Sequence, residues 1–147
     1  MRTRLWRWVV LLCVLAAGAQ AQEQEPLEPD RAFRLSVRMA APDVLEVRYR
    51  IAEGYYMYRD KFAFEVQPGT LRLGEASFPP GQVKEDPFLG RTEIYSGELS
   101  IRIPVSGHAE RGQLVVTSQG CADIIGICYP PHKQVREFKP VTGARGR

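Results

Sequence analysis

Two neighbouring stretches of the sequence alternate apolar and polar residues, and this alternation constrains the fold more than any other feature. The apolar positions are Phe33, Leu35, Val37 and Met39 in the first stretch, and Leu45, Val47, Tyr49 and Ile51 in the second. A period of two is expected of a β-strand with one buried face. The turn-forming residues Ala41-Pro42-Asp43 lie between them. We therefore predict an antiparallel pair of strands.

The rest of the chain repeats this arrangement in shorter pieces. Residues 62–66, 99–105 and 113–119 alternate in the same way, and Gly and Pro clusters separate them. No window of a dozen residues has the 3.6-residue period of a helix. We predict an all-β fold, an antiparallel β-sandwich without a substantial helix, in which 113–119 is the last clear strand and 84–90 is a charged loop.

The N-terminus has the organisation of a secretory signal peptide. Arginines at positions 2, 4 and 7 precede an apolar run over 8–17, and Ala19-Gln20-Ala21 has the form of a cleavage site. The run is too short for a membrane-spanning helix, which needs about 20 residues. We predict a cleaved signal peptide over 1–21, a flexible leader over 22–31, one domain over 32–138 and a flexible tail over 139–147, with no membrane anchor.

The charge of the chain belongs largely to this signal segment. The sequence has 20 basic and 17 acidic residues, and the first 21 residues carry three of the arginines and no acid. A nearly neutral remainder argues against nucleic acid as a partner, since phosphate binding depends on clustered Lys and Arg. Export also brings the chain into a compartment where disulfides persist.

Only two cysteines, Cys121 and Cys128, remain beyond the signal segment. Gly126 lies between them, where a tight turn favours a residue tolerant of positive φ, and Pro130-Pro131 follow closely. A disulfide here would close a short loop and stabilise the fold by roughly 2.5 kcal/mol. The spacing alone is a weak motif. A bridge between neighbours in one turn is also easily reduced, so a redox role stands beside the structural one.

Metal binding is a further alternative for these thiols. Cys121, Cys128, His108 and His132 supply the four ligands that a zinc ion needs, although their spacing matches no known zinc module. Two thiolates also suit Cu(I).

The charged neighbours of Cys128 in the sequence act on its thiolate in opposite directions. His132 and Lys133 favour the thiolate electrostatically, whereas Asp123 opposes it.

Three stretches in the same order resemble one known family. They are Gln-Gly-Cys-Ala-Asp with Gly-Ile-Cys-Tyr-Pro-Pro at 119–131, Glu-Gly-Tyr-Tyr-Met-Tyr-Arg at 53–59, and Glu-Asp-Pro-Phe-Leu-Gly-Arg-Thr-Glu-Ile-Tyr at 85–95. The family is the N-terminal periplasmic domain of the thiol:disulfide interchange protein DsbD. The resemblance covers nearly all of 32–138.

The resemblance implies an immunoglobulin-like sandwich that passes reducing equivalents to periplasmic thioredoxin-fold proteins. Cys128 would attack the partner's disulfide, and Cys121 would resolve the mixed disulfide. Phe88 would be a mobile cap over the cysteines. Tyr56, Tyr58 and Asp86 would line the pocket beneath it, although tyrosines at strand spacing are more often core residues. No cofactor or metal is required, because the electrons travel on sulfur.

Two departures from the family accompany this resemblance. Six residues separate the cysteines, one more than in the family, and the sequence ends at Arg147 without a transmembrane or thioredoxin-like domain. We therefore expect the electron donor to be another polypeptide, a membrane thiol transporter. The hypothesis is a periplasmic thiol:disulfide oxidoreductase. Its rivals are a noncatalytic immunoglobulin-like binding module with a structural disulfide, and a copper-handling protein.

Overall fold

The computed structural model describes residues 25–87 and 89–140, and its first sheet contains the predicted strand pair. Strand β1 (Phe33–Ala41) pairs antiparallel with β2 (Val44–Ile51), with Phe33 opposite Ile51. Strand β8 (Glu98–Gly107) pairs with β2, and β5 (Leu71–Leu73) pairs with β8. The order of the first sheet is β1-β2-β8-β5.

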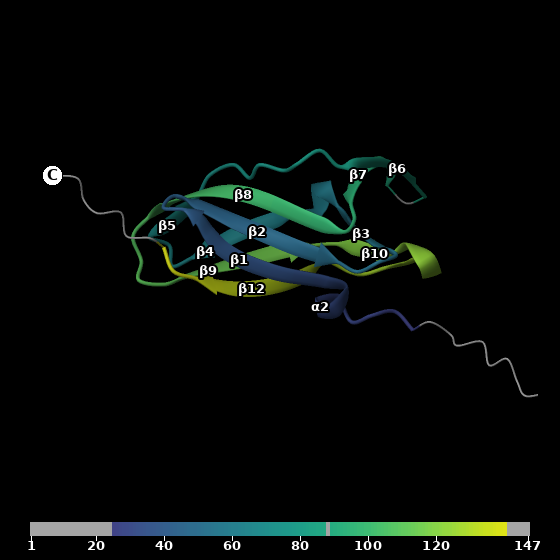
Figure 1. Ribbon diagram of the computed structural model, residues 1–147, viewed down its shortest axis with the longest axis horizontal. Coiled ribbons are helices and arrows are strands. Elements are labelled where there is room, and N and C mark those ends of the chain that lie inside the picture. Colours follow the sequence, from purple (N-terminus) through teal and green to yellow (C-terminus); the bar gives the residue numbers. More distant parts are fainter. Residues whose placement is uncertain (1–24, 88, 141–147) are drawn as a thin grey trace, which may run out of the picture.

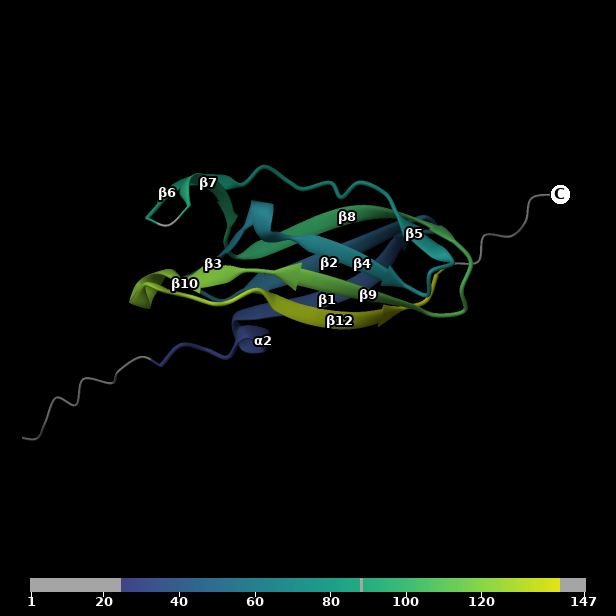
Figure 2. The same cartoon turned by 180° about the vertical axis from the view of Figure 1, so that it is seen from behind.

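A second sheet packs behind the first. It has the order β12-β9-β4 and consists of β12 (His132–Phe138), β9 (Gly112–Ser118) and β4 (Ala63–Gln67). Figure 1 shows the first sheet in front, and Figure 2 shows β4, β9 and β12 from behind. The pairings in both sheets are antiparallel. The predicted antiparallel β-sandwich is confirmed.

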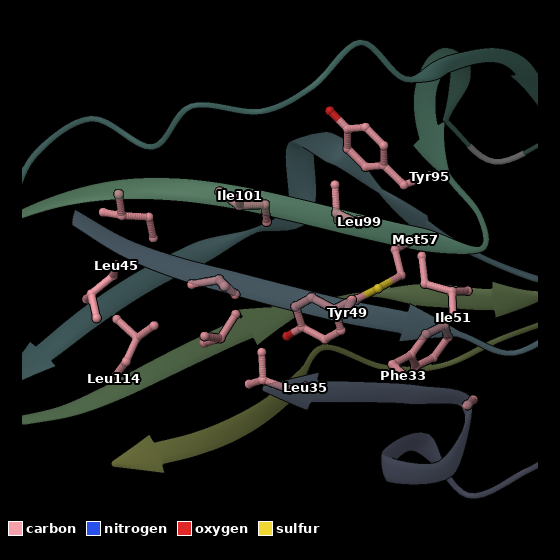
Figure 3. Packing of buried hydrophobic residues seen from close by; sticks show 14 of the residues in the cluster. Phe33, Leu35, Leu45, Tyr49, Ile51, Met57, Tyr95, Leu99, Ile101 and Leu114 are labelled. Carbon is pink, nitrogen blue, oxygen red and sulfur yellow. The ribbon is translucent and has the colours of Figure 1, made fainter. Parts of the chain in front are cut away.

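The core lies between these two sheets, where the apolar halves of the alternating strands meet (Figure 3). Leu45 and Tyr49 of β2, Ile101 of β8 and Leu114 of β9 are all fully buried. Burial of such apolar surface is the dominant favourable term in folding. The alternation read from the sequence therefore assigns the correct face of these strands to the core.

A third sheet gathers at one end of the sandwich, opposite the end that carries β5 (Figures 1 and 2). Its order is β11-β10-β3-β7-β6. Its strands are β3 (Tyr55–Tyr58), β6 (Gln82–Asp86), β7 (Gly90–Tyr95), β10 (Gly120–Ala122) and β11 (Ile127–Cys128). Both cysteines and the tyrosine-rich stretch belong to this sheet.

Helical structure within the described residues is confined to single turns. They are α2 (Pro29–Ala32) and the 3-10 turns η2 (Arg59–Lys61) and η3 (Asp123–Ile125). In residues 25–87 and 89–140, no helix is long and apolar enough to cross a membrane. The predicted absence of a substantial helix agrees with this part of the chain.

The N-terminal boundary of the fold differs from the prediction. Within the segment expected to be a flexible leader, α2 begins at Pro29, and the Leu27 N–H donates a hydrogen bond to Tyr55 Oη at 2.9 Å. Buried tyrosine hydroxyls need such partners, and this backbone supplies one. The expected signal peptide over 1–21 and the tail beyond residue 140 lie outside the described residues.

The strands that the sequence analysis did not predict include β6 and β12. Residues 84–90 are not simply a loop, because Lys84 and Asp86 belong to β6, which pairs with β7. The prediction that 113–119 is the last strand is also wrong, because β12 pairs with β9 along its whole length. In β12 the buried position 134 is a glutamine, whose Nε2 donates to Asp30 Oδ1 and to the Phe33 carbonyl. A polar residue in a buried position breaks the apolar alternation.

Candidate active site

The two cysteines lie directly opposite each other in a short hairpin at the end of the sandwich. Cys121 in β10 pairs with Cys128 in β11, and their sulfurs form a disulfide. The turn η3 connects the strands and ends at Gly126, which has a φ of 65°. Glycine adopts this left-handed conformation at little cost, so the prediction of a tight turn with positive φ at this position is confirmed.

The two sulfurs occupy different environments. Cys121 is 2% exposed, and its strand also pairs with β3, where Tyr56 lies opposite it. Cys128 is exposed on the edge strand, which is only two residues long. Pro130 and Pro131, which follow, have no N–H to extend the ladder. Cys128 is therefore an exposed residue, whereas Cys121 is covered.

Strand β3 divides its aromatic side chains between the core and the cysteines. Tyr55 and Met57 belong to the main core, whereas Tyr56 and Tyr58 form a smaller buried cluster with Cys121. Alternate residues of a strand point to opposite faces, which explains this division. Tyr56 and Tyr58, for which a core position was the alternative, therefore lie in the cluster beside Cys121 and not in the main core.

A buried carboxylate holds both of these tyrosines. Asp86 is 5% exposed, and its Oδ2 accepts hydrogen bonds from Tyr58 Oη at 2.6 Å and Tyr56 Oη at 3.1 Å. Tyr58 Oη also lies 3.2 Å from Cys121 Sγ and 3.7 Å from Cys128 Sγ. Tyr58 thus connects the carboxylate to the disulfide.

Burial keeps these hydroxyls neutral. It raises the pKa of Tyr58 well above its usual range, and the hydrogen bond to Asp86 raises it further. Burial likewise raises the pKa of Tyr56. Around neutral pH both tyrosines are therefore hydrogen-bond donors to Asp86.

A cavity of about 380 Å³ opens beside the disulfide. It is lined by Cys121, Cys128, Tyr56, Lys84, Asp86 and Pro87, among others. The structure therefore brings five of the predicted site residues together from β3, β6, β10 and β11. Phe88, predicted as the cap, lies outside the described residues, and its role stays a prediction.

Lys84 is a site residue that the sequence analysis missed. Its Nζ forms an ion pair with Asp123 Oδ1 at 2.9 Å and lies 4.9 Å from the centre of the Tyr56 ring. The contact joins the β6–β7 hairpin to the cysteine hairpin. The sequence signal that could have identified Lys84 is its spacing from Asp86. The two residues are two positions apart in β6, so they share one face of the strand.

Tyr129 is the second residue that was missed. Its N–H donates to the Gly120 carbonyl at 2.9 Å, and its hydroxyl donates to the Leu27 carbonyl at 2.6 Å. Its ring packs edge-on against Phe33 and stacks with Tyr55. The residue after Cys128 is therefore anchored to the body of the domain on several sides.

The four ligands of the zinc alternative are not assembled. His132 Nε2 lies 3.1 Å from Asp30 Oδ1, and the His108 carbonyl accepts a hydrogen bond from Thr70 in the region of β5 and β8. Among the described residues there is no group of three or more His, Cys, Asp or Glu side chains placed to hold a metal ion.

Comparison with known proteins agrees with this site. The family model described as "Thiol:disulfide interchange protein DsbD, N-terminal" matches residues 23–140. Thiol:disulfide interchange protein DsbD 1 of Pseudomonas aeruginosa is 37% identical, over 96% of this chain and 26% of that protein. The chain thus spans about a quarter of the length of this curated relative.

Solved structures give the same result. The reduced DsbD N-terminal domain of Neisseria meningitidis has a TM-score of 0.69 and 40% identity, covering 77% of this chain and 89% of that one. The complex of the DsbD and PilB N-terminal domains from the same species gives a TM-score of 0.65 and 39% identity, covering 77% and 87%. The sandwich is the immunoglobulin-like fold that the resemblance implied. By sequence, by fold and by the cysteine pair in its end sheet, the chain belongs to the DsbD N-terminal domain family.

Proposed function

We propose that this chain is a thiol:disulfide oxidoreductase domain that reduces partner proteins through Cys121 and Cys128. The observation that carries the proposal is the unequal exposure of the two bonded cysteines. Thiol–disulfide exchange needs one sulfur that a partner can reach and a second one, close by, that completes the reaction. Cys128 meets the first requirement, and the buried Cys121 meets the second.

The reaction starts from the reduced pair. The Cys128 thiolate attacks one sulfur of the partner's disulfide, so that a mixed disulfide forms and the partner's other sulfur leaves as a thiolate. The Cys121 thiolate then attacks Cys128 Sγ, which closes the Cys121–Cys128 disulfide and releases the partner's second thiolate. Two electrons pass to the partner, and the two protons lost by the cysteines balance those taken up by the partner's thiolates.

Tyr58 and Asp86 support the second step in this proposal. A buried thiol must lose its proton before it attacks, and a nearby hydrogen-bonded chain gives that proton a route. Because Tyr58 donates its own proton to Asp86 at 2.6 Å, its oxygen has a lone pair for a Cys121 thiol, and in the disulfide the Cys121 sulfur lies 3.2 Å from that oxygen. The proton leaves Cys121 toward Tyr58 while the Tyr58 proton moves to Asp86.

The segment between β6 and β7 is the proposed cap. Pro87 lines the cavity beside the disulfide, and the Leu89 N–H donates to Asp86 Oδ1 at 3.0 Å. The residues on either side of position 88, Pro87 and Leu89, therefore both lie next to the site. An apolar cap of Phe88 over Cys128 would protect the reduced pair until a partner displaces it.

Exposed apolar side chains beside the site favour docking of a protein partner. They are Val83 at 62% exposure, Leu89 at 44%, Ile124 at 60% and Ile127 at 44%, all in or adjoining the two hairpins of the third sheet. Exposed apolar clusters of this kind mark interaction surfaces. The complex of a related DsbD N-terminal domain with a PilB domain supports such docking. The partner class that we propose is a thioredoxin-fold protein in the periplasm, with a membrane thiol transporter as the electron donor.

The test is the equilibrium reduction potential of the Cys121–Cys128 pair against a glutathione or dithiothreitol buffer. A value between about −180 and −270 mV, where exchange proteins operate, is expected. A value well below about −300 mV is typical of a structural disulfide and would favour a noncatalytic binding module instead. Stoichiometric Cu(I) retention by the reduced pair without partner reduction would favour copper handling.

A further inference from the structure

The outer face of the β1-β2-β8-β5 sheet is rich in arginine. Its outward positions carry six arginines and two glutamates, and the rest are mainly serine and proline. The charged residues of this face are Arg34, Arg38, Glu46, Arg48, Arg50, Arg72, Glu98 and Arg102. Residues 22–147 as a whole have as many acidic as basic residues. The positive charge is therefore concentrated on one face of an otherwise balanced chain.

The two glutamates do not neutralise this face. Glu46 is shared by Arg38 and Arg48, and Glu98 lies 3.7 Å from Arg50 with both side chains more than 70% exposed. Exposed ion pairs of this kind are weak. In the described part of the chain, Arg34, Arg72 and Arg102 have no acidic partner within ion-pair distance.

Two of the arginines face each other directly. Arg34 of β1 and Arg50 of β2 are paired in register, and like charges in this position repel. Beside them lies a cavity of about 290 Å³ lined by Leu27, Arg31, Arg34, Arg50, Ile51 and Ala52. Three arginines and no acidic residue line this hollow. Guanidinium matches the geometry of a phosphate or carboxylate through paired hydrogen bonds.

We propose that this arginine face binds an anionic phospholipid surface, with a lipid phosphate at the Arg31-Arg34-Arg50 cavity. Basic clusters are attracted to anionic leaflets. The composition of the face favours a membrane over a protein partner, because the core of a protein interface contains large apolar side chains. Among the described residues, the exposed large apolar side chains lie elsewhere: Val83, Leu89, Ile124, Ile127 and Val135.

This orientation is compatible with the redox site. The disulfide lies in the third sheet at one end of the sandwich, whereas the arginine face is a broad side of the first sheet (Figure 1). A domain resting on a membrane through the arginine face leaves the cysteine hairpin open to partners from the side. The proposal does not depend on the redox function.

The test is co-sedimentation of the chain from Gln22, which contains the whole described fold, with lipid vesicles. One set contains phosphatidylglycerol and phosphatidylcholine, and the other contains phosphatidylcholine alone. The test variant is Arg34→Ser/Arg50→Ser. The matched control is Arg111→Ser/Lys139→Ser, which removes the same charge from exposed positions outside the arginine face.

Binding is expected only to the anionic vesicles and to weaken with salt. Each arginine near an anionic surface is worth about fivefold in affinity, so the test variant should bind about 25-fold more weakly than the parent chain. The control should bind within about twofold of the parent chain, because its arginine face is intact. Circular dichroism and the rate of disulfide exchange should be unchanged in both variants.

Three results would overturn the proposal. Equal loss of binding in the test and control variants would mean a general charge effect. Equal binding to both vesicle types would mean that lipid charge is not recognised. Binding of inorganic phosphate or of an acidic peptide without binding of anionic vesicles would mean an oxyanion site that does not serve membrane docking.

Discussion

Cys121 and Cys128 are directly opposed in two antiparallel strands, yet only Cys128 is exposed to solvent. The difference arises from the sheet order, because β10 lies between two strands and β11 is at the edge. The edge position makes one sulfur available for attack, while the neighbouring strand β3 covers the other. The two cysteines are therefore chemically distinct, although they are partners in one bond.

Single substitutions of the two cysteines should behave differently. Cys121→Ser leaves the exposed thiol, so a mixed disulfide with oxidised glutathione should accumulate. Cys128→Ser leaves the buried thiol, which should react at least about tenfold more slowly because access limits exchange. Mass spectrometry of timed, acid-quenched samples measures both rates. Equal rates in the two variants would refute the assignment of Cys128 as the attacking thiol.

Loss of the Tyr58 hydroxyl should slow the resolving step. In Tyr58→Phe the buried Cys121 thiol has no hydroxyl through which its proton can leave, and proton transfer of this kind contributes about a hundredfold or more in enzymes. The mixed disulfide should therefore persist longer after the reduced variant meets an oxidised partner. Quenched-flow detection of that adduct gives the rate.

Tyr95→Phe is the matched control for this experiment. Tyr95 is also buried, and its hydroxyl donates to the Pro79 carbonyl at 2.7 Å rather than to the site. Tyr95→Phe loses one hydrogen bond to a neutral carbonyl, which should cost about 1 kcal/mol, whereas Tyr58→Phe also removes a donor from the buried Asp86 carboxylate and should cost about 1.5 to 3 kcal/mol. If both variants slowed resolution equally, Tyr58 would have only a structural role.

The Lys84–Asp123 ion pair should restrict access to the disulfide. The side chains are 27% and 59% exposed, so Lys84→Met should cost no more than about 1 kcal/mol of stability. It should, however, free the β6–β7 hairpin from the cysteine hairpin, and reduction of the disulfide by a neutral phosphine should become faster. High salt should accelerate the parent chain toward the rate of the variant.

Arg111→Met serves as the control, because Arg111 pairs with Glu137 at 3.9 Å and lies outside the cavity beside the disulfide. Its phosphine rate should equal that of the parent chain at every salt concentration. A parent rate that does not respond to salt would show that the ion pair does not hold the two hairpins together.

Much of the sandwich was predictable, because the strands that build its core alternate strictly. Leu99, Ile101 and Ile103 of β8 are buried with Ser100 and Arg102 between them, and this pattern is local. Strand β12 was not predictable in this way, because its buried position 134 is a glutamine, whose amide nitrogen donates to Asp30 and to the Phe33 carbonyl. Strand β6 was not predicted because it is a charged strand at the edge of its sheet, and it lacks the alternating apolar pattern.

Less of the site than of the sandwich could be predicted from local sequence patterns. The cysteine turn could be predicted from Gly126 and the spacing of the two cysteines. The approach of Asp86 to Tyr58 joins residues 28 positions apart and depends on the pairing of β6, β7 and β3. Only the family resemblance indicated that these residues share a pocket. Tyr129 had no local signal, and the strand spacing of Lys84 and Asp86 was informative only once residues 82–86 were known to form a strand.

Substitution of Tyr129 should give a stability difference that depends on pH. Tyr129→Phe keeps the ring contacts and removes the hydrogen bond to the Leu27 carbonyl, so it should cost about 1 kcal/mol at pH 7. Burial, followed by the hydrogen bond to Tyr55, raises the pKa of Tyr129 to about 12. In the unfolded chain the same hydroxyl titrates near about 10.

The sign of the pH effect follows from these two values. Above pH 10 the unfolded chain releases the proton that the folded chain still holds, so the parent loses stability as the pH rises toward about 12. Because the hydroxyl is only partly buried, the loss is smaller than the limit of about 1.4 kcal/mol per pH unit. Tyr129→Phe lacks this group, so the gap between the two proteins should narrow between about pH 10 and pH 12. Urea unfolding at pH 7 and at pH 11 measures the gap. Val135→Ala, a substitution of an exposed residue, keeps Tyr129, so its difference from the parent chain should be the same at both pH values. A gap for Tyr129→Phe that stays constant with pH would mean that the Tyr129 hydroxyl is not protected from solvent as the structure indicates.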